Sequence, residues 1–478
     1  MTREQQQIPI RVLGDDFSRI PSAVIETRYK LLFVIGAVLV GVLITAFVFY
    51  PGVMSPDSLN QFGQARRGQI SGDEFPPIMA FVWRYADRLI PGPFGMMLLH
   101  NLAFWGGLGL LVWACRFGPV ASALWILGVG LFPPVFALLG IVWKDVGMAA
   151  ALTLSVGMAL VGRRQRAPAL VVLSLIPLLY AISVRFNALP AILPVASLIC
   201  ASVVVATGRR PLRVRTYLGL GLALTLLLMA VSSLINRMIV ASPSAGVHVA
   251  GLQSSLIHDI AGISAYSGEV LFPAYILRTR PEITLERLRE GYRPADVVRL
   301  TSRRYWQDSR FYTRDGQEFD ELWRAWRHAV MGHPMAYLRH RAGVLETMFQ
   351  LRGDVFYPFE QGIPPNDLDL HFPRRAVYLT VISFLEQTTG VFFRSWPFLI
   401  TALGVICWGW SRRTWAPVVV CASGVAYVFP YAVVSSGSDF RYVWWLIVAT
   451  LISSMLLIDS MVFSSRSSHQ ISRGSRSS

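Results

Sequence analysis

Long apolar segments separated by short polar stretches dominate the pattern of this chain. Ten of these segments come close to the roughly 20 residues that an α-helix needs to cross a membrane. Few charged residues fall inside them. The pattern predicts an all-α fold, a polytopic transmembrane bundle of about ten helices. The predicted spans are 31–50, 94–115, 119–140, 145–162, 167–184, 187–207, 216–239, 395–411, 415–435 and 440–462.

The region 376–393 decides how often the chain crosses, because it is moderately apolar but carries polar residues at 386–388. Arginine and lysine gather in the cytoplasmic loops of membrane proteins. The basic stretches 163–166 and 209–215 fall on one side of the predicted bundle, and 412–413 and the basic tail share that side only if 376–393 does not cross. We therefore predict an interfacial helix near 376–393 and both termini in the cytoplasm.

The remaining pattern divides the chain into four parts. The segment between the seventh and eighth predicted spans is too long for a simple connection, and its apolar residues over 318–351 recur at helical spacing, interrupted at Pro334. We expect this segment to be extracytoplasmic and mostly helical. The parts are an N-terminal membrane module at 1–239 with a first outer loop at 51–93, the extracytoplasmic segment at 240–394, C-terminal membrane helices at 395–463, and a disordered cytoplasmic tail at 464–478.

Composition excludes a soluble globular protein, since 54% of the residues are hydrophobic, 15% are charged and the mean hydropathy is +0.48. The net charge of +16 comes almost entirely from arginine, because the only lysines are Lys30 and Lys144. These arginines flank the apolar segments and form no single stripe, which argues against nucleic-acid binding. The polar start of the chain has no pattern of a removable signal peptide, and the first span is expected to act as its own signal.

The first outer loop holds the leading candidate residues. Asp57 lies in a Ser-Pro-Asp-Ser run just after the first span, and Asp73 and Glu74 follow before a Pro-Pro pair. Asp57 could serve as the N-cap of an interfacial helix, or it could be a carboxylate at the lip of a cavity. We take Asp57, Asp73 and Glu74 as the candidate catalytic residues.

Further charged and polar residues fall on the same predicted side. Singly, each could anchor a helix end at the interface. Lys144 and Asp145 could pair with each other, and Asp259, beside His258, could cap a local helix. Their convergence on one face favours a binding site. The candidate substrate-binding residues are Lys144, Asp145, Arg185, Asn187, His258, Asp439 and Arg441.

Cations beside carboxylates at the outer membrane surface suit the chemistry of a sugar carried on a lipid phosphate. Arginine or lysine would bind the phosphate and stabilise it as the leaving group. A carboxylate would accept the proton of the attacking hydroxyl. The chain has no glycine-rich phosphate loop with its lysine, so we do not expect ATP use. No cofactor is expected, and a divalent metal is left open.

Five short motifs resemble the GT-C superfamily of integral-membrane glycosyltransferases. They are the run 51–61, Pro76-Pro77, Trp143-Lys144-Asp145, Arg185-Phe186-Asn187, and Asp439-Phe440-Arg441-Tyr442. The resemblance implies a polyprenyl-phosphate sugar donor and a catalytic acidic residue in the first outer loop, at Asp57, with a second acidic element at Asp73-Glu74. Related chains often have histidine before the Pro-Pro pair, where this chain has Phe75.

The leading hypothesis is therefore an inner-membrane glycosyltransferase that transfers a hexose or pentose to an extracytoplasmic glycan, lipid or protein acceptor. A transporter or flippase of lipid-linked saccharides is the alternative, because Pro133-Pro134 and the pair Pro190 and Pro194 are expected to break two spans. An oligosaccharide polymerase acting on a diphosphate-linked substrate is a third possibility.

Overall fold

The computed structural model describes residues 22–72, 75–240, 250–280, 282–295, 297, 300, 311–352 and 359–474. This part of the chain is all-helical and contains no β-strand, only an isolated bridge between Val53 and Ile141. The N-terminal half contains α1 (Ser22–Phe49), α2 (Pro56–Arg67), α3 (Ile78–Leu89), α4 (Phe94–Ala114), α5 (Pro119–Gly130), α6 (Pro133–Leu139), α7 (Lys144–Arg164), α8 (Pro168–Leu173), α9 (Leu175–Val184), η1 (Phe186–Ala188), α10 (Leu189–Ala206) and α11 (Val214–Ile239). The C-terminal half contains α12 (Ala250–Ser267), α13 (Ala274–Thr279), α14 (Leu285–Gly291), α16 (Gly316–Gly332), α17 (Pro334–Met348), α18 (Ala376–Gln387), α19 (Thr389–Phe392), α20 (Trp396–Ser411), α21 (Trp415–Val428), α22 (Tyr431–Val434) and α23 (Arg441–Gly474).

Eight helices of the described chain are long and apolar enough to cross a membrane, or nine if the bent pair α5 and α6 counts as one span. The chain is thus a multi-pass membrane protein. The segment predicted to span over 167–184 is instead two shorter helices, α8 and α9, so the count of ten stays a prediction.

Prolines act differently in the two spans where we expected breaks. The pair at Pro133 starts α6 and separates it from α5 by a bend of 68°. By contrast, α10 begins at Leu189 with Pro190 in its first turn and runs through Pro194 without interruption. The expected break in α10 was wrong. Pro190 lies in the first turn, where a backbone N–H has no partner within the helix and its loss costs little. Pro194 removes one hydrogen bond of the interior, and the helix continues past it.

The region 376–393 forms the 12-residue α18 followed by the short α19. At 1.5 Å per residue, α18 is about 18 Å long, which falls short of the roughly 30 Å of a bilayer core. Past residue 463, where we expected a disordered tail, α23 continues as far as Gly474. Extending an existing helix needs no new nucleus, so polar residues can continue it.

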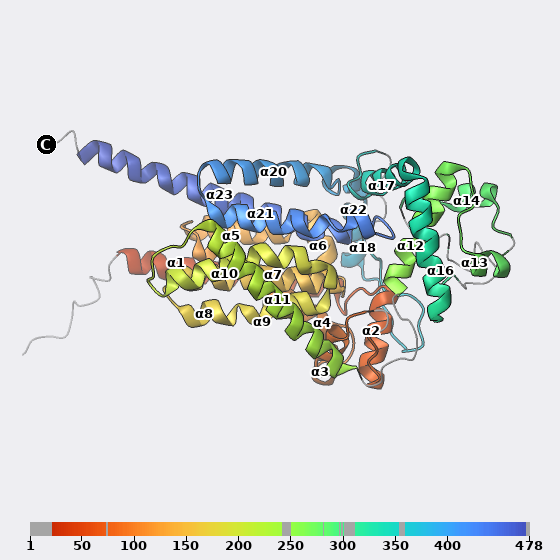
Figure 1. Cartoon of the computed structure of the whole chain (residues 1–478). Helices are drawn as coiled ribbons and strands as arrows, with labels where there is room; N and C mark the ends of the chain where they lie inside the picture. The colour runs from red at the N-terminus through yellow and green to blue at the C-terminus, as the bar shows by residue number, and fades with distance from the viewer. Residues whose placement is uncertain are drawn as a thin grey trace, which may run out of the picture.

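The helices pack as one elongated bundle (Figure 1). Three tryptophans, Trp105, Trp444 and Trp445, are among its largest fully buried side chains. Glycines let α4 and α7 approach closely, because a Cβ on Gly107 would lie 2.6 Å from the Leu154 nitrogen and one on Gly157 would lie 2.8 Å from the Gly107 oxygen. Small residues at helix contacts are typical of membrane bundles, where close packing drives association.

The two ends of the bundle differ. At one end, called here the far end, Lys30 at the start of α1 donates to the Cys115 carbonyl (2.7 Å), and Arg164 at the end of α7 donates to the same oxygen (2.5 Å). Arg116 pairs there with Asp459 of α23 (3.6 Å). Figure 1 shows the start of α1 and the end of α23 at this end, on the left.

Helices α12, α13, α14, α16 and α17 form a cap at the opposite end (Figure 1, right). The cap has its own apolar cluster, which includes Ile257, Ile260, Leu288 and Leu322. The prediction of two helices meeting at Pro334 is confirmed, since α16 ends at Gly332 and α17 begins at Pro334.

Candidate functional site

Helix α2 begins in the loop after α1, at the end of the bundle that carries the cap. Ser55 is the N-cap of α2, its side chain accepts from the Ser58 N–H, and the Ser58 side chain accepts from the Ser55 N–H. Pro56 takes the first helical position, where it is favoured. The idea that Asp57 caps this helix is therefore wrong. Its carboxylate is instead left for other contacts, with 32% of the side chain exposed.

Backbone pairing fixes this loop against the turn between α6 and α7. The Val53 N–H donates to the Gly140 oxygen and the Val142 N–H donates to the Val53 oxygen, both at 2.9 Å. Side chains add two bonds, from Trp143 Nε1 to Ser55 Oγ (2.8 Å) and from Ser58 Oγ to the Val142 oxygen (2.7 Å). The two motifs that carry Asp57 and Lys144 are thus held side by side.

Arg441 joins the first loop to the last turn of the chain. Its Nη1 lies 3.0 Å from Asp57 Oδ2, and its Nε lies 2.8 Å from Asp439 Oδ2. The Asp439 carboxylate also accepts from the Arg441 backbone N–H (3.1 Å). The guanidinium carbon lies 5.0 Å from the centre of the Trp143 ring, a cation–π contact that further fixes its position.

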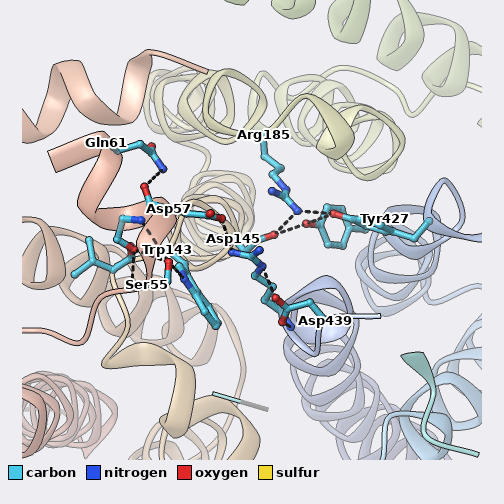
Figure 2. A network of polar contacts seen from close by, with 12 residues as sticks. Ser55, Asp57, Gln61, Trp143, Asp145, Arg185, Tyr427 and Asp439 are labelled. Atoms are coloured by element: carbon cyan, nitrogen blue, oxygen red, sulfur yellow. Dashed lines mark hydrogen bonds and ion pairs between the residues drawn. The ribbon is translucent and has the colours of Figure 1, made fainter. Parts of the chain in front are cut away.

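A second ion pair lies deeper, between Asp145 and Arg185. Arg185 Nη2 is 3.1 Å from Asp145 Oδ1, and Tyr427 donates to the same oxygen at 2.9 Å. Arg185 also donates to the Tyr431 hydroxyl (2.9 Å). Asp145 therefore pairs with Arg185 at the end of α9, so the alternative of a local pair with Lys144 is wrong. Figure 2 shows Asp57, Asp145, Arg185 and Asp439 converging on one network.

Lys144 is the cation of this cluster that has no ion-pair partner among the described residues. Its side chain is buried, with 8% of the residue exposed, and its Nζ lies 3.9 Å from the centre of the Phe75 ring. The Lys144 amine therefore lies against an aromatic face and has N–H donors that make no ion pair among the described residues.

Two carboxylates of the cluster have shifted pKa values in opposite directions. Burial raises the pKa of Asp57, but Arg441, Lys144 and Arg185 together lower it more, so the pKa lies below its ordinary value. Burial raises the pKa of Asp439 above its ordinary value, with Arg441 opposing the effect and the carboxylates of Asp145 and Asp57 adding to it. Asp57 is therefore the more firmly ionised of the two.

Glu360 is a neighbour of the cluster that sequence reasoning missed. Burial raises its pKa, the negative charges of Asp439 and Asp57 add to the rise, and Arg441 opposes it. Its segment is held to the first loop, because the Met54 N–H donates to the Gly362 oxygen (2.9 Å). Glu360 carries no spacing or motif signal, whereas Tyr427 and Tyr431 could have been noticed as polar-tipped aromatics near the end of an apolar run.

Two predicted site residues that the structure describes, Asn187 and His258, do not join this network. Asn187 lies in η1 and is exposed, away from the contacts that link Arg185 to its partners. His258 is fully buried in the cap. Asp73 and Glu74 lie outside the described residues.

His258 belongs to a separate buried cluster between α12 and α17. Its neighbour Asp259 pairs with His340 Nε2 (2.9 Å) and Arg341 Nη2 (2.5 Å) and accepts from Trp326 (2.7 Å). Asp259 lies in the middle of α12, so the idea that it caps a helix was wrong. Burial lowers the pKa of His258 to about 4, so this ring is neutral at physiological pH.

The cap is tied to the turn that carries Asp439 and Arg441. Arg341 Nη1 donates to the Ser435 oxygen (2.7 Å), and Ser438 Oγ donates to the Val344 oxygen (2.8 Å). The Ser438 N–H also donates to the Ala295 oxygen (2.6 Å). The position of the Asp57–Arg441–Asp439 network therefore depends on how the cap is seated.

Among the described residues, no group of three or more histidine, cysteine, aspartate or glutamate side chains has an arrangement that could hold a metal ion. Comparison with protein-family models, with curated proteins and with solved structures gave no match.

Proposed function

We propose that this protein is a membrane glycosyltransferase that moves a sugar from a polyprenyl-phosphate donor to a glycan, lipid or protein acceptor outside the cytoplasm. The observation that carries the proposal is the Asp57–Arg441–Asp439 network beside the buried Lys144, placed where the bundle meets its cap. A carboxylate can act as the general base of such a transfer. Cationic side chains with available donors at a helix end can stabilise the leaving phosphate.

The donor phosphate would bind between Lys144 and Arg441. Both residues begin a membrane-spanning helix, α7 and α23, so they lie near the depth of lipid headgroups. Helix N-termini favour anions. Arg185 is less available for this role, because its guanidinium already faces Asp145 and Tyr431. Its part is to hold Asp145 and the tyrosines in place beside the phosphate site.

Asp57 would act as the general base. In the proposed step, the acceptor oxygen attacks the anomeric carbon of the sugar and the bond from that carbon to the phosphate oxygen breaks. The bonding electrons leave with the polyprenyl phosphate, whose charge Lys144 and Arg441 stabilise. The proton of the acceptor hydroxyl passes to Asp57 and from there to solvent, which reaches the partly exposed carboxylate.

Donor binding would also tune this base. In the free protein, Arg441 and Lys144 hold the pKa of Asp57 below its ordinary value. A phosphate bound to the same two cations offsets their charge, so the pKa of Asp57 rises and the carboxylate becomes a stronger base when the donor is in place. This coupling would limit proton abstraction to the loaded enzyme.

The proposed orientation follows from the arginine-rich loops. The far end, with Arg116, Arg163 and Arg164, would face the cytoplasm, and the cap would lie outside. In a cell with two membranes, the protein would lie in the inner one. Both termini would then be cytoplasmic.

Transport of a lipid-linked saccharide is the second candidate function. The 68° bend between α5 and α6 is the observation that favours it, since broken helices line the substrate sites of many transporters. A polymerase would share the cluster but would use a diphosphate-linked donor.

Purified protein in lipid nanodiscs, given polyprenyl-phosphate sugars and a panel of acceptors, tests the proposal directly. We expect release of polyprenyl phosphate in step with sugar transfer. In cells, deletion of the gene should remove one sugar from a surface glycan, as read by mass spectrometry. Accumulation of the complete lipid-linked precursor, with no transfer by the purified protein, would instead establish transport.

A further inference from the structure

The far end of the bundle contains an apolar groove that the proposed glycosyltransfer does not use. The groove has a volume of about 470 Å³, within the roughly 300–1,000 Å³ typical of ligand sites. It runs between α1 and α4, and Val161 of α7 and Leu170 of α8 also line it. From α1, Leu31, Ile35 and Leu39 line it and remain 44%, 47% and 54% exposed, so the groove opens toward the membrane.

Glycines in α4 shape this groove. A Cβ on Gly109 would lie 2.8 Å from Val38 Cγ2, so the glycine lets α1 approach α4. One turn earlier, a Cβ on Gly106 would meet nothing within 4 Å, so the missing side chain leaves open space. Helices α1 and α4 therefore pack closely at Gly109 and leave open space at Gly106, and this space forms the floor of the groove.

Cations gather where the groove ends. Trp113 and Gln165 are its last lining residues, and Lys30 Nζ lies 5.6 Å from the centre of the Trp113 ring. Arg164 stands next to Gln165 and is exposed, and Arg28 lies one helical turn before Leu31 on the same face of α1. Two acidic residues lie near these cations. Glu26 carries an opposing negative charge, whereas Asp459 is already paired with Arg116. The end of the groove is thus positively charged.

We propose that this groove binds one acyl chain of an anionic glycerophospholipid whose phosphate headgroup lies against Lys30 and Arg164. The acyl chain gains no hydrophobic energy relative to the surrounding bilayer, because lipid tails are as apolar as the side chains that they meet. Selection must therefore come from the fit of the chain to the gap at Gly106 and from the charge of the headgroup. An anionic lipid satisfies both, whereas a zwitterionic lipid satisfies only the first. The inference is independent of the reaction proposed for the other end of the bundle.

The test compares phosphatidylglycerol with phosphatidylcholine on purified full-length protein. After mild delipidation, we expect native mass spectrometry to show phosphatidylglycerol retained in preference to phosphatidylcholine when equal amounts are offered. Gly106→Leu fills the gap and should abolish this preference. Gly128→Leu is the matched control, because a Cβ at Gly128 on the neighbouring α5 also meets nothing within 4 Å, and this variant should keep the preference.

Charge is tested by Lys30→Gln and Arg164→Gln. Each should lower the ratio of retained phosphatidylglycerol to phosphatidylcholine by about fivefold, from the typical contribution of one basic residue at an anionic lipid surface. The ratio is read within each variant, so a general loss of stability does not affect it. Equal retention of the two lipids by the unmodified protein would overturn the proposal, and so would a preference that survives in Gly106→Leu.

Discussion

Arg441 Nη1 lies 3.0 Å from Asp57 Oδ2, although 384 positions separate the two residues in the chain. The contact joins the loop after α1 to the start of the last membrane helix. On the other side of the same guanidinium, Asp439 Oδ2 lies 2.8 Å from Arg441 Nε. Arg441 is thus fixed between two carboxylates, with the rest of its fork available to a ligand, and this arrangement sets the expected effects of substitution.

Replacement of Arg441 should weaken donor use in a graded way. Lysine keeps the charge but loses the planar fork that can face a carboxylate and a phosphate together, so we expect Arg441→Lys to raise the apparent KM for the donor. Arg441→Gln should raise it further. The matched control is Arg116→Lys, which alters an arginine–carboxylate pair at the far end and should leave the donor KM unchanged. An unchanged KM in both Arg441 variants would remove this residue from the donor site.

The two lysines provide an internal comparison. Lys144→Gln removes the cation that has no ion-pair partner among the described residues, and we expect a loss of at least about tenfold in kcat/KM for the donor, as for one charge-assisted phosphate contact of about 1.5 kcal/mol. Lys30→Gln, at the far end, should leave kcat/KM within about twofold of the unmodified value. Steady-state kinetics on protein of matched folded fraction measures both. Equal effects of the two substitutions would contradict a role for Lys144 in binding the phosphate.

The pH dependence of kcat/KM distinguishes the possible bases. Asp57 has a pKa below its ordinary value of about 3.9, so it stays ionised and the profile should show no acid limb from about pH 5 to 8. Asp439 and Glu360 have raised pKa values, and either one as base would make the rate fall as the pH decreases toward its raised pKa. Arg441→Gln removes the main positive charge that lowers the pKa of Asp57. That pKa should therefore rise, and the acid limb should move to higher pH. An acid limb that stays in place in this variant would argue against Asp57.

Topology is testable with fusions at two positions. A reporter after Arg375 should read outside and one after Ser464 should read inside, because the short α18 does not itself reach across a bilayer. If both reporters read the same side, region 376–393 crosses the membrane and the ten-span prediction is wrong.

The membrane helices could be read from the sequence because long apolar runs have one stable outcome in a bilayer. The division into α8 and α9 was harder to predict, because a 17-residue apolar stretch has the same pattern whether it forms one helix or two. The continuous α10 shows the same limit, because whether Pro194 breaks a helix depends on its packing neighbours.

The sequence predicts which residues gather in the candidate site better than it predicts which of them form ion pairs with each other. Placing Asp57, Lys144 and Arg441 on one side required only the count of spans and the position of basic loops. That Asp145 pairs with Arg185, and not with adjacent Lys144, depends on helix rotation that the sequence does not specify. His258 was misplaced for a similar reason, since the packing of α12 on α17 turns it into the interior of the cap.

The substitution Asp57→Asn tests whether the Asp57 carboxylate is the general base. Ser55 caps α2 and Asp439 still pairs with Arg441, so the variant should fold, insert and bind the donor. Asp369→Asn is the matched control, since that aspartate is 97% exposed and lies outside the network. With both variants purified at matched thermal stability, we expect Asp57→Asn to transfer sugar at least about a hundredfold more slowly and Asp369→Asn to match the unmodified protein. Transfer by Asp57→Asn at the unmodified rate would show that Asp57 is not the base and that another group accepts the proton.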